Sequence, residues 1–426
     1  MTISRIAWLF LMGASALAAE TTATGNEWLL PNFAYRLSVE VSNSGRMPVQ
    51  ALATVPVAKA RTVAPDFPGR IAFAVVLNGA GSAQPVTIVA SQADDLDGDG
   101  IPDQFEFPVS LAAGERRRVD IYYSTTLDDS ISWPKQVQAK HSYGYNRQVA
   151  AIESELIGYR TYGGFFLDVQ AREAGSRGLY NDFAAYVPPR LNFQKGRDVL
   201  HIGDTLGLGG IFLRRENRLY QPPMNVPDYA HKPSPEMVPH YRVIAQGPLR
   251  AIIETTLEPW TIDGDIVNLK AQYSIDAAKT FVRCRFEAIP IRVQPSHEYE
   301  VGIGIRDLPN ESLLPAPGRL IVTGQQNQRD GKIGLALYFD EKQFWSSAPV
   351  RTSESSNQAV VSKTQLKPGQ AVSGEYTATA AWTGSGIKDP GTALAALTTA
   401  AAQHIDVGDF VFARNPHPEN IDAESH

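Results

Sequence analysis

Short runs in which apolar and polar residues alternate recur along most of the chain, and this period of two limits the fold more than any other feature. Such runs, separated by Gly, Pro and Asn, lie at 35–41, 71–77, 86–89, 119–123, 266–276 and 281–287. Successive residues of a β-strand face opposite sides of a sheet, so this alternation predicts antiparallel strands. Only residues 392–404, rich in Ala and Leu, favour a helix. We therefore expect an all-β fold.

The length indicates more than one folded unit. The chain has 426 residues, whereas typical domains have ~100–200 residues. Weak periodicity between two strand-rich regions predicts a linker. We expect a signal peptide at 1–18, an N-terminal β-sandwich at 19–128, a linker at 129–150, a main β-rich domain at 151–410 and a loose tail at 411–426.

The first residues have the pattern of an export signal. One basic residue, Arg5, precedes an apolar run at 6–18 that ends in the Ala-x-Ala pattern of Ala16 and Ala18. This arrangement is typical of a secretory signal peptide. The run is shorter than the ~20 residues that a transmembrane helix needs, and no later apolar stretch is longer. We expect a periplasmic or secreted protein without a membrane span.

Charge and cysteine content exclude further classes. The net charge is −6 and no basic run is present, which argues against binding to nucleic acid. The single cysteine, Cys284, cannot form an internal disulfide in an oxidising compartment. Stability must then come from packing and from any bound metal.

Residues 95–106 have the spacing of an EF-hand calcium loop. Its predicted ligands are the carboxylates of Asp95, Asp97, Asp99, Asp103 and Glu106, with the backbone carbonyl of Ile101. Calcium needs six to eight oxygen ligands around a tight turn, and Gly100 supplies that turn. Because the flanking residues are strand-like, we expect structural Ca²⁺ rather than a sensor. The alternative is an acidic surface turn that binds no ion.

A second polar pattern lies at 158–172. Its even positions carry the polar side chains Arg160, Tyr162, Asp168, Gln170 and Arg172, whereas its odd positions are mostly apolar. An unbroken strand pleat would place the polar groups on one sheet face, suited to a sugar or a carboxylate. The alternative is an ordinary solvated face. His201 follows beside a glycine-rich turn that is no dinucleotide fingerprint, and a buried, hydrogen-bonded histidine is its commoner explanation.

The order of these motifs resembles a known family. The segments 153–164, 167–169, 199–210, 247–250 and 258–260, with the acidic loop ahead of them, are similar to the bacterial family known only as domain of unknown function 4861. The resemblance implies a secreted protein of polysaccharide breakdown that often acts on uronate-containing chains. It also implies a β-rich fold. We therefore expect an N-terminal β-sandwich-like region and a large antiparallel domain similar to the galactose mutarotase-like supersandwiches.

The leading functional hypothesis is a lyase or dehydratase that performs β-elimination on a uronic acid. This reaction needs a cation near the substrate carboxylate, a base for the C5 proton and an acid at O4. Arg160 is the candidate cation, His201 the base, and Tyr162 or Tyr180 the acid. The candidate substrate-binding residues, suited to an anionic oligosaccharide, are Asp168, Gln170, Trp260, Arg283 and Arg285.

Two alternatives stay open. A glycoside hydrolase would use two carboxylates among Glu155, Asp168 and Asp204, ~5–9.5 Å apart. A non-catalytic carbohydrate-binding protein would stack sugar rings on the aromatic side chains of Tyr162, Tyr180 and Trp260.

Overall fold

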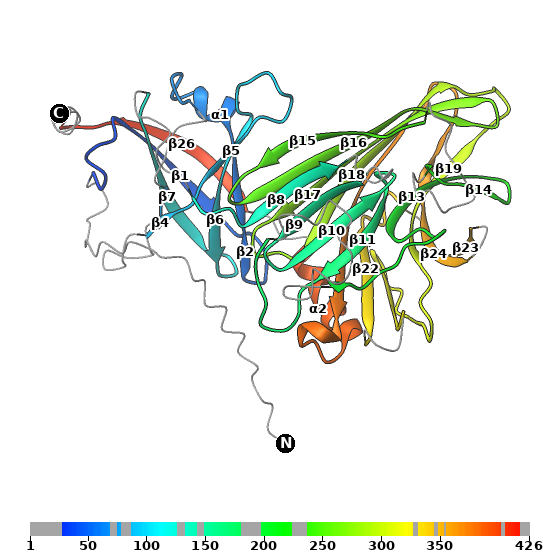
Figure 1. Ribbon diagram of the computed structural model, residues 1–426. Helices are drawn as coiled ribbons and strands as arrows, with labels where there is room; N and C mark the ends of the chain where they lie inside the picture. Colours follow the sequence, from blue (N-terminus) through cyan, green and yellow to red (C-terminus); the bar gives the residue numbers. More distant parts are fainter. Residues whose placement is uncertain are drawn as a thin grey trace. The chain divides into compact units, whose positions relative to one another are not determined.

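The chain folds almost entirely into antiparallel β-strands, which confirms the predicted all-β class (Figure 1). The computed structural model describes residues 28–68, 75–77, 87–125, 133–142, 149–179, 197–223, 237–326, 331–344, 348–352, 355–401 and 405–417. Two compact units are present. The first comprises Met1–Ser91, Phe107–Ile131 and Ile405–His426, and the second comprises Gln92–Glu106 and Ser132–His404. The acidic loop thus clusters with the second unit, and the last strand clusters with the first.

The first unit is built on a sheet with the strand order β26-β1-β7-β3-β4. Its strands are β1 (Tyr35–Ser42), β3 (Val75–Leu77), β4 (Thr87–Val89), β7 (Arg116–Tyr123) and β26 (Asp406–Arg414). Strand β2 (Val49–Pro56), which pairs with β6 (Gln104–Leu111), runs directly into the short helix α1 (Val57–Arg61). The side chains of Leu37, Val119 and Ile121 are fully buried, as the alternating pattern predicts.

The second unit contains two large antiparallel sheets. The ten-stranded sheet has the order β23-β24-β19-β13-β11-β10-β9-β8, with β12 beside β11 and β14 beside β13. Its strands are β8 (Val137–Ser142), β9 (Val149–Ser154), β10 (Ile157–Tyr162), β11 (Phe166–Ala171), β12 (Arg197–Asp198), β13 (Leu208–Arg215), β14 (Arg218–Tyr220), β19 (Tyr299–Arg306), β23 (Ala348–Arg351) and β24 (Ser356–Leu366).

The eight-stranded sheet of this unit has the order β15-β16-β17-β18-β25-β22-β21-β20. Its strands are β15 (His240–Gln246), β16 (Arg250–Ile262), β17 (Asp265–Asp276), β18 (Phe281–Arg292), β20 (Ser312–Leu313), β21 (Arg319–Gly324), β22 (Ile333–Phe339) and β25 (Val372–Trp382). One apolar core, with Tyr159 and Phe212 from the first sheet and Leu269 and Tyr273 from this one, joins the two sheets. These large antiparallel sheets confirm the predicted supersandwich class.

Three short elements complete the second unit. Strand β5 (Gln92–Asp94) pairs with the start of β6 and flanks the acidic loop. A 3₁₀ turn, η3 (Thr383–Ser385), precedes helix α2 (Pro390–Ala401), close to the predicted helix at 392–404. Leu394 of α2 packs on Ile321 and Ala336. No helix among the described residues is long and apolar enough to cross a membrane.

Candidate functional site

The polar pattern at 158–172 forms one face of the hairpin β10–β11. Arg160 lies opposite Asp168 in the strand register, and Gly158 lies opposite Gln170. The strands turn at Gly163 and Gly164, whose φ angles are +55° and +80°. A Cβ atom on Gly164 would lie 2.0 Å from Cγ2 of Thr255, so this position requires glycine. The odd-numbered apolar side chains of these strands belong to the core, as the alternation predicts, and the even-numbered Phe166 next to the turn joins them.

Arg160 is buried between two carboxyl groups. Its Nε donates to Asp168 Oδ2 at 3.1 Å, and its Nη2 donates to Asp168 and, at 2.9 Å, to Oδ2 of Asp198. The guanidinium carbon also lies 5.1 Å from the ring centroid of Tyr162. Burial, with the neighbouring Asp198, raises the pKa of Asp168 to about 8. Because two carboxyls already engage Arg160, the geometry does not favour it as a cation for a substrate carboxylate.

His201 lies apart from these contacts. Its backbone N–H donates to Gln326 Oε1 at 2.8 Å, and its backbone carbonyl accepts from Arg306 and from Gln326. The residue is exposed, and its imidazole forms no hydrogen bond with any residue that the structure describes. Within the same residues, no contact joins it to Arg160 or Tyr162. Tyr180, the second candidate acid, lies outside the described residues.

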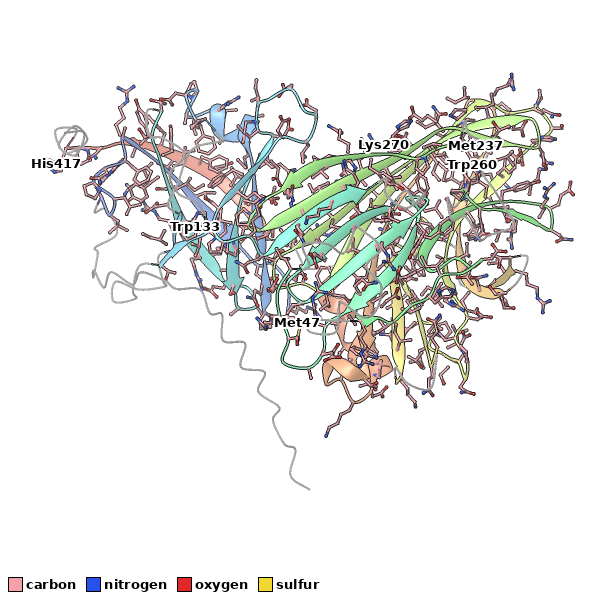
Figure 2. All side chains as sticks on the ribbon, viewed as in Figure 1. Met47, Trp133, Met237, Trp260, Lys270 and His417 are labelled. Carbon is pink, nitrogen blue, oxygen red and sulfur yellow. The ribbon has the colours of Figure 1, made fainter. Side chains whose placement is uncertain are left out.

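The remaining substrate-binding candidates lie on the eight-stranded sheet. Trp260, labelled in Figure 2, lies on β16. The structure corrects its expected stacking role: its side chain belongs to the core and is 3% exposed, which leaves no ring face for a sugar. Arg285 lies on the outer face of the sheet, where its Nε contacts Glu375 at 2.8 Å. Arg283 lies on the same face, 3.8 Å from Asp276. Carboxylates therefore partly neutralise the predicted basic face.

The three carboxylates considered for hydrolysis are held in different places. Glu155 Oε2 accepts the backbone N–H of Ala278 at 3.2 Å. Asp204 lies in the turn before β13, where its carbonyl accepts from Thr352. Among the described residues, no contact brings either of them to Asp168. The carboxyl that accompanies Asp168 is Asp198, which the sequence pattern did not single out.

The acidic loop is a tight turn that gathers three carboxylates. Oxygen atoms of Asp95, Asp97 and Asp99 lie within 4.8 Å of one another. Gly98 and Gly100 have φ angles of +87° and +90°, which only glycine adopts at little cost. Their N–H groups donate to the two carboxylate oxygens of Asp95, at 2.7 and 2.8 Å. The loop closes through the backbone N–H of Leu96, which donates to Asp103 Oδ2 at 2.7 Å.

The last residue of the loop enters a buried cluster of charges. Glu106 is fully buried and forms an ion pair with Arg250, whose Nε contacts Oδ1 of Asp276 at 2.7 Å. Gln92 binds Asp94 Oδ1 at 2.6 Å and the carbonyl of Arg250 at 2.8 Å. An ion in the loop would share Glu106 with Arg250.

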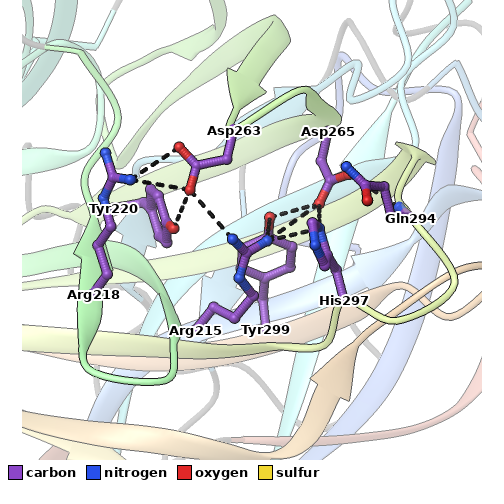
Figure 3. A network of polar contacts seen from close by, with 8 residues as sticks. All are labelled: Arg215, Arg218, Tyr220, Asp263, Asp265, Gln294, His297 and Tyr299. Carbon is purple, nitrogen blue, oxygen red and sulfur yellow. Dashed lines mark hydrogen bonds and ion pairs between the residues drawn. The ribbon is translucent and has the colours of Figure 1, made fainter.

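A network of polar contacts joins three turns of the second unit (Figure 3). The hairpin β13–β14 supplies Arg215, Arg218 and Tyr220, the turn between β16 and β17 supplies Asp263 and Asp265, and the segment from the end of β18 into β19 supplies Gln294, His297 and Tyr299. These segments are far apart in sequence, so no sequence motif predicted the network. Its one local signal is Asp263-Gly264, a dipeptide typical of tight hairpin turns.

Asp265 fixes the orientation of His297. The buried carboxylate accepts from the Tyr299 hydroxyl at 2.6 Å and the Gln294 N–H at 3.0 Å, and its Oδ2 lies 2.7 Å from His297 Nδ1. Burial raises the pKa of Asp265, but the hydrogen bonds from Tyr299 and His297 outweigh it, and the pKa lies below its ordinary value. The carboxylate is therefore ionised.

Nδ1 of His297 lies between two charged groups, 2.7 Å from Asp265 Oδ2 and 2.7 Å from Arg215 Nη1, which also donates to the Tyr299 hydroxyl at 3.0 Å. Nδ1 can donate to the carboxylate only in the Nδ1–H tautomer, and it can accept from the guanidinium only in the Nε2–H tautomer. In the Nδ1–H tautomer the lone pair lies on Nε2, which forms no hydrogen bond with a described residue. This tautomer is the one that a general base at Nε2 requires.

A phenol and an exposed cation lie on the other side of Tyr299. The Tyr220 ring packs edge-on against Tyr299 with centroids 5.9 Å apart, and its hydroxyl donates to Asp263 Oδ2 at 2.5 Å. Burial and this bond raise the pKa of Tyr220. Arg218 Nη1 lies 3.1 Å from both oxygens of Asp263. The Arg218 side chain is 68% exposed, and its guanidinium carbon lies 4.9 Å from the centroid of the Tyr220 ring. Its Nε and Nη2 form no hydrogen bond with a described residue.

Comparison with known proteins bears on the family and the fold. No curated protein matches the chain in sequence. Two solved structures from Enterococcus faecalis are similar to it, each with 8% identity: a protein in glycosyl hydrolase family 38 (TM-score 0.44) and an α-mannosidase (TM-score 0.43). The matches cover 89% and 87% of this chain but 48% and 46% of those chains, so the chain spans about half their length.

The family comparison is decisive. The model described as "Domain of unknown function (DUF4861)" matches residues 50–165 and 192–403, which include the acidic loop, strand β10 and the three turns of the polar network. The resemblance inferred from the motif order is thereby confirmed, and the chain belongs to the DUF4861 family.

Proposed function

We propose that this protein is an exported carbohydrate-active enzyme, a lyase or dehydratase that performs β-elimination on uronate-containing oligosaccharides. The observation that carries the proposal is the dyad of His297 and Asp265, with Tyr220 beside the Tyr299 ring and the guanidinium carbon of Arg218 4.9 Å from the centroid of the Tyr220 ring. This set supplies a base, an acid and a cation. It replaces His201, Tyr162 and Arg160 in the roles first expected for them.

Each group has one role in the reaction. Arg218 binds the uronate carboxylate through Nε and Nη2, which makes the C5 proton more acidic. Nε2 of His297 takes that proton, and the electron pair of the C5–H bond becomes the C4=C5 double bond. The C4–O4 bond breaks, and O4 takes a proton from the Tyr220 hydroxyl. The phenolate then regains a proton from solvent, and the protonated His297 releases one to solvent.

The electrostatics of the network suit these roles. The raised pKa of Tyr220 keeps its phenol protonated at neutral pH, so it has a proton to donate. The exposed guanidinium of Arg218 is available to an incoming anion, whereas the buried Arg160 is already held by two carboxyls. An anionic sugar chain is therefore the substrate class that this network fits best.

Replacement of His297 by Gln is expected to abolish most of the activity. General-base catalysis contributes ~10²–10⁴-fold to a rate, so the rise of absorbance from the unsaturated uronate should slow by about that factor. The assay incubates the full chain with a panel of uronate oligosaccharides. The matched control is His201→Gln, an exposed histidine outside the network, which should retain the wild-type rate.

Two outcomes would contradict the proposal. Equal rates in the two variants would remove His297 as the base, and a loss confined to the His201 variant would restore the earlier assignment. If no oligosaccharide yields an unsaturated product while binding persists, the protein is a non-catalytic carbohydrate-binding module, and the network is structural.

We also propose that the acidic loop binds structural Ca²⁺ after export, where calcium is abundant. Asp95, Asp97, Asp99, the Ile101 carbonyl and Asp103 would hold the ion, with Glu106 shared with Arg250. A calcium concentration tenfold above the dissociation constant would stabilise the fold by about 1.4 kcal/mol. The melting temperature should therefore rise on addition of Ca²⁺ and fall with chelator.

A loop variant controls the calcium experiment. Asp97→Asn in combination with Asp99→Asn should remove the calcium-dependent rise, whereas Glu341→Gln, a single exposed acid outside the loop, should leave it unchanged. A melting temperature that is the same with calcium and with chelator would show that the loop is an acidic turn without an ion.

A further inference from the structure

The polar face of β10–β11 contains two buried atoms with unmet hydrogen-bonding capacity. Among the described residues, neither Asp168 Oδ1 nor Gln170 Nε2 has a hydrogen-bond partner. Both residues belong to β11, two positions apart, so their side chains lie on the same sheet face. Asp198 of β12 is the register partner of Gln170 and reaches the same guanidinium as Asp168.

Unpaired buried polar atoms are costly, about 1–3 kcal/mol each. Proteins leave few of them, and each needs a cause such as an ordered water or a ligand. Asp168 is 1% exposed, whereas the Asp198 side chain is 49% exposed. The cluster therefore opens to solvent at Asp198, which is where a ligand would enter.

Burial and the neighbouring Asp198 raise the pKa of Asp168 to about 8. The one cation of the cluster, Arg160, is already engaged by Oδ2 of Asp168 and by Asp198. A further anion gains nothing here, so the cluster does not select a uronate carboxylate.

A hydroxyl group matches the three side chains. Its oxygen accepts a hydrogen bond from Gln170 Nε2, and its own proton is donated to a carboxyl oxygen, which Asp168 Oδ1 and the Asp198 side chain both offer on this face. Sugars are rich in such groups, and bonds to a charged acceptor are the stronger kind. We propose that Asp168, Gln170 and Asp198 form a subsite that binds an uncharged sugar residue through one of its hydroxyl groups.

This subsite is separate from the network around His297 and needs no chemistry of its own. Together the two sites would suit a polysaccharide in which uronates and neutral sugars alternate. The subsite does not depend on the proposed elimination, because a protein without activity could still bind a neutral sugar there.

The test measures affinity and stability together. Calorimetric titration of the full chain uses neutral hexose, pentose and deoxyhexose oligosaccharides, with uronate oligosaccharides alongside. Gln170→Leu should weaken binding of the neutral sugar about tenfold, equal to about 1.4 kcal/mol, and Asp198→Asn should weaken it at least as much. The matched control is Gln272→Leu, a similarly half-buried glutamine on β17, which should bind as the wild type does.

The melting temperature separates binding from a structural role. Without sugar, Gln170→Leu should melt at or above the wild-type temperature, because it removes a buried donor that has no partner. A lower melting temperature with unchanged affinity would overturn the subsite, as that result indicates an internal water or a structural amide. Failure of every neutral oligosaccharide to bind the wild type would also overturn it. Loss of uronate elimination alone would not.

Discussion

Replacing Arg250 with methionine is expected to lower the free energy of unfolding by about 3–5 kcal/mol. The guanidinium lies between Glu106, which is fully buried, and Asp276, which is nearly so. Burial raises the pKa of Asp276, but Arg250 outweighs it and holds the pKa below its ordinary value. Without the arginine, two buried carboxylates lose their cation. Removing one partner of a buried ion pair costs more than the pair contributes.

Urea unfolding of the full chain measures this loss, and Arg285→Met is the matched control. Arg285 pairs with Glu375 on an exposed part of the sheet, and exposed pairs contribute only about 0–1 kcal/mol. Equal losses in the two variants would show that the Arg250 cluster is no more important than a surface pair.

The pH dependence of the Arg250 variant has a definite sign. In the wild type, the lowered pKa of Asp276 contributes stability above the ordinary aspartate pKa of ~3.9, and this contribution disappears as the pH falls through the lower folded value. In Arg250→Met the carboxyls protonate more readily. The difference in the free energy of unfolding between the wild type and Arg250→Met should therefore narrow as the pH falls below ~4.

Alternation predicted strands and their faces wherever the pleat is regular. The hairpin β17–β18 pairs Tyr273 with Cys284 and Ala271 with Phe286, and all four side chains are buried as the alternation requires. The same logic gave the two faces of β10–β11, because the glycine turn there does not disturb the register. Local pattern is sufficient for such elements, since the period of two comes from the backbone itself.

Trp260 shows where local pattern fails. Counted from Leu257, a strict period of two would place its side chain on the opposite face of β16. The register shifts between Leu257 and Trp260, so both residues face the core. A bulge of this kind inserts an extra residue into one strand, so the side chains after it face the sheet side opposite to the one that strict alternation predicts. The alternation of the sequence does not show where such a residue is inserted.

The site residues could be predicted only in part for a related reason. Arg160 and Asp168 are neighbours on one hairpin, and their meeting follows from a single turn. Asp198 comes from a later strand, and His297, Asp265 and Tyr220 come from three turns whose proximity depends on the order of strands in both sheets. Contacts of that kind arise from topology, which single-sequence periodicity does not contain.

Replacement of Asp265 by Asn is expected to reduce turnover on the order of 10³–10⁴-fold while the KM for a uronate oligosaccharide changes little. The amide has nearly the same shape, and its oxygen in the place of Oδ1 can still accept from the Gln294 N–H. Its NH₂ group then takes the place of Oδ2, where it no longer accepts from Tyr299 and would donate to Nδ1 of His297. The imidazole proton then moves to Nε2, and the base loses the lone pair that takes the C5 proton.

Steady-state kinetics on the unsaturated product tests this expectation. Tyr299→Phe is the control, because it removes the hydroxyl's hydrogen bonds to Asp265 and from Arg215 but keeps the carboxylate against Nδ1 of His297. Its turnover should fall far less than that of Asp265→Asn. Arg218 is unchanged in both variants, so a KM that rises as steeply as kcat falls would indicate a collapsed site. Near wild-type turnover in Asp265→Asn would show that the carboxylate only holds the three turns together through hydrogen bonds and that His297 is not the base.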